Sequence, residues 1–253
     1  MNKTISAVLL TALLLGAVGA QEKLWSAWTK AEAEKILNQS GWGQTQTDTD
    51  TSEMMYSPTS QSGMSSSTRS GTLGTTTDRQ SINNNRASQG ANNQAISVNY
   101  HVRLLSAKPV RQAFMRVIEL TQKTPDKELL DGLRSFVDRD FGEFIVVAVS
   151  FDSTDGRYSG PALQAFASAT LGTLRNRTYL ERKDGKRVFL KEYHAPINDG
   201  LGAKFIFPRI VDEKKFITAD SGMFRFYSEV TNQLKLNVSF KTSELMYNGQ
   251  LEY

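Results

Sequence analysis

The chain contains 253 residues, of which 22% are charged and 39% are hydrophobic, and it has no cysteine. The fold must therefore be stabilised by burial alone, because neither disulfide bonds nor zinc sites with thiolate ligands are available. The formal net charge of +4 is too small to predict binding to nucleic acid, so we expect no nucleic-acid partner.

Residues 1–20, MNKTISAVLLTALLLGAVGA, have the pattern of a secretory signal peptide. One lysine precedes an apolar stretch from Ile5 to Leu15, and small residues follow up to Ala20. The stretch is shorter than the roughly 20 apolar residues that cross a bilayer. We therefore expect cleavage near Ala20 and an extracytoplasmic protein, periplasmic or secreted, whose mature chain has no transmembrane segment.

Residues 21–50 predict a short helix and a first strand. Thr29 and Glu32 have the spacing of a capping box, and apolar residues follow at helical spacing, so a helix is expected over 30–39. From Trp42 the sequence WGQTQTDTD places a threonine at every second position, which is typical of an exposed strand.

Residues 51–94 form a polar tract in which most residues are Gly, Ser, Thr, Asn or Gln. Such a composition buries too little apolar surface to offset the entropy of ordering, so disorder is expected. The segment before the tract is too small to fold alone. The tract is therefore predicted to be a loop insertion within one domain, between residues 21–50 and 95–253, and its flanking strands are expected to lie close together.

The chain after the tract predicts a strand and then two helices. Ile96 to Leu104 alternate between apolar and polar residues, which indicates a half-buried strand. Pro109 suits the first turn of a helix, and a second helix is expected from Pro125 to Gly142.

The remaining sequence predicts one buried strand, one helix and then strands only. The apolar run FIVVAVSF at 144–151 predicts the most buried strand, and a third helix is expected over 160–175. Hairpin turns are expected at Asp184-Gly185 and Asn248-Gly249. We therefore predict an α+β fold with a mostly antiparallel sheet, three to four helices and a C-terminal third that is all strand.

Four stretches resemble a family of uncharacterised exported bacterial proteins: WTKAEAEKILNQSGW, YHVRLLSAKPVRQAF, KFIFPRIVDEKKFITADSG and FKTSELMYNGQLEY. The resemblance touches less than half of the mature chain. It implies export and a single domain, and it contributes no catalytic residue. Residues 51–94 are not part of the resemblance, which is consistent with an insertion.

The loop DSTDGRYSG, residues 152–160, is the first candidate site because it connects the buried strand to a helix. Backbone N–H groups at a helix start favour an anion, and Arg157 and Ser159 could assist them. Asp152 and Asp155 instead suggest a cation, although their spacing differs from the calcium-loop pattern. The alternative is that Asp152 and Ser159 are turn and cap residues and that Arg157 is solvated.

The sequence has two histidines and no HExxH or thiolate motif, so no metal site, cofactor or catalytic residue is predicted. His101 shares its strand face with Asn99 and Arg103, opposite the apolar positions of the strand. We therefore expect His101 to face solvent.

His194 is the more ambiguous histidine, because Glu192 and Asp199 lie near it in the sequence. A role in a turn or in packing is one interpretation, and a ligand-binding or catalytic role is the other. A serine hydrolase could combine His194 and Asp199 with Ser159 or Ser221, but no spacing selects that combination.

A strongly basic hairpin in the last third is the second candidate site. With a two-residue turn at Asp184-Gly185, Lys183 would face Lys186 and Arg182 would face Arg187. Directly opposed like charges destabilise a sheet, so an anionic partner is one explanation for them. A charged edge that prevents aggregation is the other.

These features favour a non-enzymatic, exported binding module of the cell envelope, with an anionic envelope polymer or a protein as its partner. The alternatives are a small-molecule hydrolase that uses the 152–160 loop with His194, and a structural spacer that uses residues 51–94. The oligomeric state is not predicted.

Overall fold

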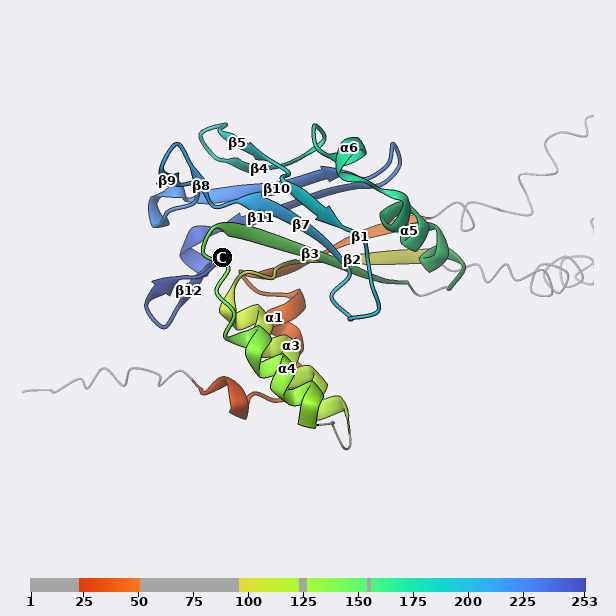
Figure 1. The fold of residues 1–253 in the computed structure, drawn as a ribbon. Helices are drawn as coiled ribbons and strands as arrows, with labels where there is room; N and C mark the ends of the chain where they lie inside the picture. Colours follow the sequence, from red (N-terminus) through yellow and green to blue (C-terminus); the bar gives the residue numbers. More distant parts are fainter. Residues whose placement is uncertain (1–22, 51–95, 123–126, 154–155) are drawn as a thin grey trace, which may run out of the picture.

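The computed structural model describes residues 23–50, 96–122, 127–153 and 156–253 (Figure 1). The predicted signal peptide, 1–20, and the polar tract, 51–94, lie outside the described residues and stay predictions. In the described part of the chain, no helix is long and apolar enough to cross a membrane.

The larger sheet has five strands, all antiparallel, in the order β1-β2-β3-β7-β6. Its strands are β1 (Gly43–Asp50), β2 (Ile96–Leu104), β3 (Phe144–Ser153), β6 (Glu192–His194) and β7 (Ala203–Pro208). β1 pairs with β2 from Gly43 opposite Arg103 to Asp50 opposite Ile96. The strands on either side of the polar tract are therefore direct neighbours, as expected.

The smaller sheet has four antiparallel strands in the order β11-β10-β4-β5. Its strands are β4 (Thr178–Arg182), β5 (Arg187–Phe189), β10 (Met223–Glu229) and β11 (Lys235–Lys241). Two short hairpins, β8 (Ile210–Val211) with β9 (Lys214–Lys215) and β12 (Met246–Tyr247) with β13 (Gln250–Leu251), complete the strands. From β4 to its end the chain is all strand apart from short 3-10 turns, which confirms the predicted α+β class.

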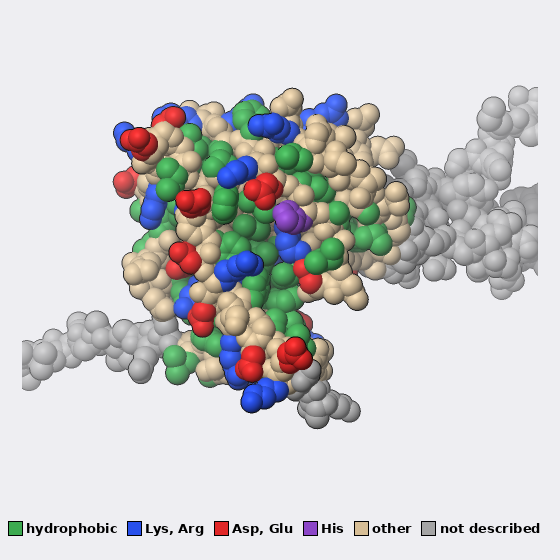
Figure 2. Space-filling model, viewed as in Figure 1, with side chains coloured by type: hydrophobic (Ala, Val, Ile, Leu, Met, Phe, Trp, Pro, Cys, Tyr) green, Lys and Arg blue, Asp and Glu red, His purple; other side chains and the backbone are tan. Residues whose placement is uncertain are grey.

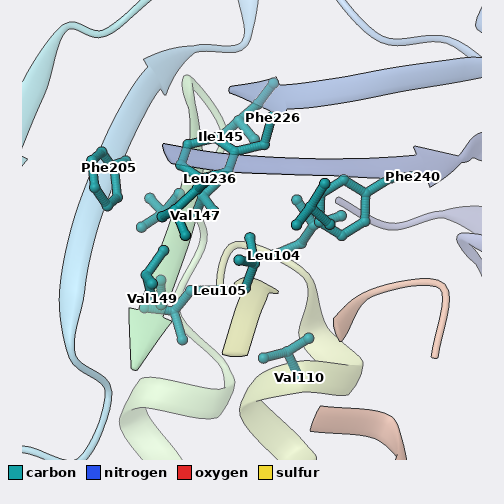
Figure 3. Packing of buried hydrophobic residues seen from close by; sticks show 14 of the residues in the cluster. Leu104, Leu105, Val110, Ile145, Val147, Val149, Phe205, Phe226, Leu236 and Phe240 are labelled. Atoms are coloured by element: carbon teal, nitrogen blue, oxygen red, sulfur yellow. The ribbon is translucent and has the colours of Figure 1, made fainter. Parts of the chain in front are cut away.

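The two sheets pack face to face, and the core lies between them (Figure 3). Alternate residues of each strand point inward, as the period of two requires. The ring centroids of Phe205 from the larger sheet and Phe226 from the smaller sheet are 5.3 Å apart. Ile145, Val147 and Val149 of β3 are buried, as expected for the most apolar strand.

Side chains and a short crossover close the two open sides of this sandwich. On one side, Gln44 Nε2 donates to Ser239 O at 2.8 Å and Gln46 Nε2 donates to Lys235 O at 2.8 Å. Asn237 N donates to Gln46 Oε1 at 2.9 Å. The two glutamine side chains therefore form hydrogen bonds with backbone groups at the edge of β11. On the other side the chain passes directly from β5 in one sheet to β6 in the other.

Three helices pack together on the side of the larger sheet that faces away from the smaller sheet (Figure 1). They are α1 (Lys30–Asn38), α3 (Lys108–Thr121) and α4 (Lys127–Val137). The capping box is confirmed, because Thr29 Oγ1 accepts from Glu32 N at 3.3 Å and Glu32 Oε2 accepts from Thr29 N at 2.6 Å. Hydrogen bonds from Lys23 and Thr29 lower the pKa of Glu32 to about 2.

Two helix ends differ from the sequence prediction. α4 ends at Val137 rather than Gly142. The buried Arg111 guanidinium donates to Val137 O, the last carbonyl of the helix, and to Arg139 O just beyond it, both at 3.1 Å, and so satisfies carbonyls at this end in place of further helical bonds. The helix expected over 160–175 is two helices, α5 (Gly156–Ser168) and α6 (Leu171–Leu174). A second capping box at Thr170 starts α6.

Candidate functional site

The loop after β3 is only partly described. Asp155 lies outside the described residues, and of Arg157 only the backbone, in the first turn of α5, is described. Ser159 also lies in the first turns of α5, and its side chain is half-buried. The anion and cation sites expected at this loop therefore stay predictions.

Asp152 makes its contacts across the larger sheet. Its Oδ2 lies 2.6 Å from His101 Nε2, and its Oδ1 accepts from Asn99 Nδ2 at 2.9 Å. Burial raises the pKa of Asp152, but the hydrogen bonds from His101 and Asn99 outweigh it and hold the pKa below its usual range. Asp152 thus belongs to a hydrogen-bonded network rather than to a turn alone.

The expectation that His101 faces solvent is wrong. The His101 side chain is only 14% exposed, and Thr45 Oγ1 lies 2.9 Å from its Nδ1 while Asp152 lies on its other side. The imidazole therefore connects β1, β2 and β3 through side chains. The pattern within β2 could not reveal these partners, because they depend on the register with the two neighbouring strands.

His194 does not join this network. Its side chain is 58% exposed in the edge strand β6, and its Nε2 lies 3.8 Å from Glu192. β7 lies between β6 and β3, so Asp152 and His194 are on strands that are not neighbours. Asp199 pairs with Lys204 Nζ at 2.6 Å instead of with His194. The structure therefore does not assemble the hydrolase combination that the sequence left open.

The basic hairpin has a different turn from the one expected. Glu181 lies opposite Arg187, and Arg182 N donates to Lys186 O at 2.9 Å, which leaves a loop of residues 183–185. Gly185 takes a φ of 82°, the left-handed position that such a loop requires. The predicted facings of Arg182 with Arg187 and of Lys183 with Lys186 are therefore wrong, and Arg187 faces the Glu181 carboxylate instead.

Two of the four hairpin candidates are paired with carboxylates. Arg187 Nε donates to Glu181 Oε1 at 2.6 Å, and Arg182 Nη2 donates to Asp184 Oδ2 at 2.9 Å. Lys183 and Lys186 have no ion pair among the residues that the structure describes. The hairpin tip therefore keeps two ammonium groups for an anionic partner.

A row of aromatic rings crosses the outer side of the smaller sheet. Tyr179 pairs with Phe189 on β5 and with Tyr227 on β10. The ring centroids of Tyr179 and Tyr227 are 5.1 Å apart and nearly parallel, and those of Tyr179 and Phe189 are 5.8 Å apart. Phe189 is 45% exposed. These three rings form an aromatic row on the outer side of three adjacent strands, in which Tyr179 and Tyr227 stack on each other and Phe189 is the most exposed.

A second row, of charged side chains, runs beside the aromatic one. Glu181 on β4 lies between Arg187 on β5 and Arg225 on β10, and its carboxylate accepts from both guanidiniums. The hydrogen bond from Arg187, more than the one from Arg225, holds the pKa of Glu181 below its usual range. The Arg187 guanidinium lies 4.4 Å from the Tyr179 ring centroid, and the Arg225 guanidinium lies 6.0 Å from that of Tyr227.

We refer to these two rows as the aromatic–arginine face. It consists of Tyr179, Glu181, Arg187, Phe189, Arg225 and Tyr227. A concavity of about 520 Å³ adjoins the charged row towards the hairpin tip and is lined in part by Lys183, Met223 and Ser239. α1, α3 and α4 lie against the larger sheet and leave this face open (Figure 1).

Comparison with protein-family models, curated proteins and solved structures gave no match. In the described residues, no group of three or more His, Cys, Asp or Glu side chains could hold a metal ion. Function must therefore be argued from the geometry of the sites themselves.

The basic hairpin is recognisable in the sequence, whereas the aromatic residues and Arg225 were not predicted to belong to a site. A signal for them was present, because FRFY in β10 and TYLE in β4 place a large residue on both faces of each strand. Which of the rings is buried and which lies outside depends on the pairing of β4 with β10, which the sequence alone does not specify.

Proposed function

We propose that this protein is an exported, non-enzymatic module of the cell envelope that binds an anionic polymer across the aromatic–arginine face. The observation that supports the proposal is the pair of parallel rows, in which the half-buried Tyr179 and Tyr227 stack on each other and Arg187 and Arg225 lie beside them. Rings and guanidiniums together suit a polymer whose repeat carries a ring and a carboxylate or phosphate.

The shape of the face favours a polymer over a small molecule. The aromatic row spans three strands, β5, β4 and β10, which corresponds to about 10 Å across the sheet. Small-molecule sites bury most of the ligand in a cleft. An open row on a sheet instead supports successive repeats of an extended chain, as stacking platforms for single-stranded polymers do.

The charges of the face favour an anion even though Glu181 is part of it. The Glu181 carboxylate accepts hydrogen bonds from Nε of Arg187 and from Nη2 of Arg225. The other N–H groups of the two guanidiniums have no acceptor among the described residues. Each arginine therefore keeps donors that are fixed in place for a ligand oxygen. Lys183 and Lys186 at the hairpin tip add two charges to the same side.

Affinity electrophoresis through gels that contain a polymer tests this proposal. Polygalacturonate supplies carboxylates, a phosphorylated mannan supplies phosphates, and dextran is the neutral reference. We expect either or both anionic polymers to retard the chain, more strongly at low salt, and dextran to have no effect. The anionic polymer that retards the chain identifies the acidic group that is bound. Retardation by dextran alone, or by none of the three polymers, would contradict the proposal.

Matched variants locate the site. The double variant Arg187→Gln, Arg225→Gln should bind roughly tenfold more weakly, because two charged hydrogen-bond donors are lost. The control Lys30→Gln, Arg134→Gln removes the same charge from helices on the larger sheet and should leave binding nearly unchanged. Equal losses in both variants would show that net charge, rather than this face, drives binding.

A further inference from the structure

A second surface lies on the larger sheet, whereas the aromatic–arginine face lies on the smaller one. It is a groove of about 510 Å³ between the loop that precedes β3 and the edge strand β6. Its floor is apolar and consists of Phe141, Phe144, Val146 and Ile206. Figure 2 shows a strip of hydrophobic side chains along the middle of one face, with charged side chains on both sides of it.

The rim of the groove is mainly acidic. Carboxylates of Asp140, Glu143 and Glu192 line it, against one guanidinium, that of Arg139. Glu143 has no side-chain ion pair among the described residues, and the only described partner of Glu192 is His194 at 3.8 Å. These carboxylates are therefore available to a cation that enters the groove.

The aromatic floor already holds cations of this chain. Lys191 Nζ lies 4.4 Å from the Phe144 ring centroid, and the guanidiniums of Arg111 and Arg139 lie 4.8 Å and 5.9 Å from that of Phe141. The Arg111 guanidinium is buried and donates to backbone carbonyls, so it is not placed to pair with the rim. Neither Glu143 nor Glu192 has a lysine or arginine partner among the described residues, which favours a ligand that is both apolar and basic.

The edge strand indicates that this ligand is a peptide. β6 pairs with β7 through Glu192 opposite Ile206 and His194 opposite Lys204. No strand in the described part of the chain pairs with the other edge of β6. An extended peptide can add to such an edge, and its alternate side chains then point to the same side of the sheet as Glu192 and the groove.

We infer that this groove binds an extended segment of a partner protein in which an apolar side chain is flanked by lysine or arginine. The apolar side chain contacts Val146 and Ile206, and the basic side chains pair with Glu143 and Glu192. The inference does not depend on the aromatic–arginine face, which lies on the other sheet and carries the opposite charge. With both surfaces occupied, the protein would connect an anionic polymer to a protein partner.

Titration of the ¹⁵N-labelled full chain with three synthetic peptides tests the inference. The probe is Ser-Gly-Lys-Phe-Lys-Gly-Ser, and the controls replace both lysines by glutamate or the phenylalanine by serine. We expect the first peptide to shift the amide signals of Phe144, Val146 and Ile206, and both controls to bind at least about threefold more weakly. Equal binding of the glutamate peptide, shifts elsewhere on the surface, or no shifts at millimolar peptide would overturn it.

Rim variants complete the test. Glu143→Gln with Glu192→Gln should weaken the lysine peptide by roughly threefold or more, since two exposed ion pairs are lost. The control Glu34→Gln with Asp131→Asn removes the same charge from α1 and α4 and should leave the affinity unchanged. The amide spectrum of each variant shows directly that it is folded, and an equal effect of both variants would overturn the assignment of the groove.

Discussion

Arg187 lies directly opposite Glu181 in the β4–β5 hairpin, and its Nε donates to the Glu181 carboxylate at 2.6 Å. The same carboxylate accepts from Arg225 on the next strand. A single acidic residue thus fixes two guanidiniums beside the aromatic row. This arrangement gives the face both its order and its remaining positive charge.

The variant Glu181→Gln separates the effect of Glu181 on the order of the face from its effect on the charge of the face. The variant raises the net charge by one and loses two charged hydrogen bonds at the sheet surface, so its free energy of unfolding should fall by about 1 kcal/mol. Because the freed guanidiniums face the ligand, binding to the anionic polymer should become tighter at low salt. Urea unfolding and affinity electrophoresis measure the two effects. An unchanged affinity would show that the arginines do not contact the polymer.

The aromatic row predicts a difference between two variants of Tyr179. Tyr179→Ala removes the central ring and should weaken polymer binding by about tenfold, given the usual contribution of one stacking side chain. Tyr179→Phe keeps the ring and should bind within about twofold of the original chain. Similar losses in both variants would assign the effect to the hydroxyl group rather than to stacking.

The network around His101 predicts a stability that depends on pH. Asp152 has a pKa below its usual range, so its contribution to the free energy of unfolding is present above the unfolded pKa and is lost as the pH falls through the folded pKa. In Asp152→Asn this acid-dependent loss should be smaller. Urea unfolding at neutral and acidic pH measures the difference, and parallel pH profiles for the two chains would contradict the role of Asp152.

His101→Ala should lower the free energy of unfolding by about 1–2 kcal/mol, because contacts to Thr45 and Asp152 are lost from a largely covered position. A suitable comparison is His194→Ala, which changes an exposed histidine of the edge strand and should have an effect within about 0.5 kcal/mol. The reverse order of the two effects would contradict the structure around β1, β2 and β3.

Arg111 should be the most sensitive of the buried charged residues. Its guanidinium donates to four backbone carbonyls, those of Leu105, Ser106, Val137 and Arg139. Arg111→Met removes these donors and leaves carbonyls unsatisfied, so the free energy of unfolding should fall by about 3 kcal/mol or more. Thermal unfolding measures it. A loss below about 1 kcal/mol would mean that water replaces the guanidinium readily.

The fold class and most elements could be predicted from the sequence because they depend on local patterns. Alternation in 96–104, the apolar run at 144–151 and the Thr29 capping box each specify one element through its own residues. The exceptions have long-range causes: α4 ends early because Arg111, from another helix, satisfies the carbonyls of Val137 at its end and of Arg139 just beyond it.

The candidate site was predictable only in part for the same reason. The basic hairpin is contiguous, so its charges could be recognised, whereas Arg225 joins them through a strand pairing more than forty residues away, as the separation of Glu181 and Arg225 shows. Arg187 lies opposite Glu181 because the loop at Gly185 has one residue more than the predicted two-residue turn. That additional residue shifts the register, so every cross-strand pair of the hairpin differs from the predicted one.

Mapping the amide signals of the ¹⁵N-labelled full chain during titration with polygalacturonate oligomers shows directly whether the polymer binds the aromatic–arginine face. We expect shifts that are concentrated at Tyr179, Arg187, Phe189, Arg225 and Tyr227, that diminish at high salt and that are absent with dextran oligomers. Shifts that spread over basic residues of both sheets, or that centre on the β1–β3 surface around His101, would contradict binding at the aromatic–arginine face.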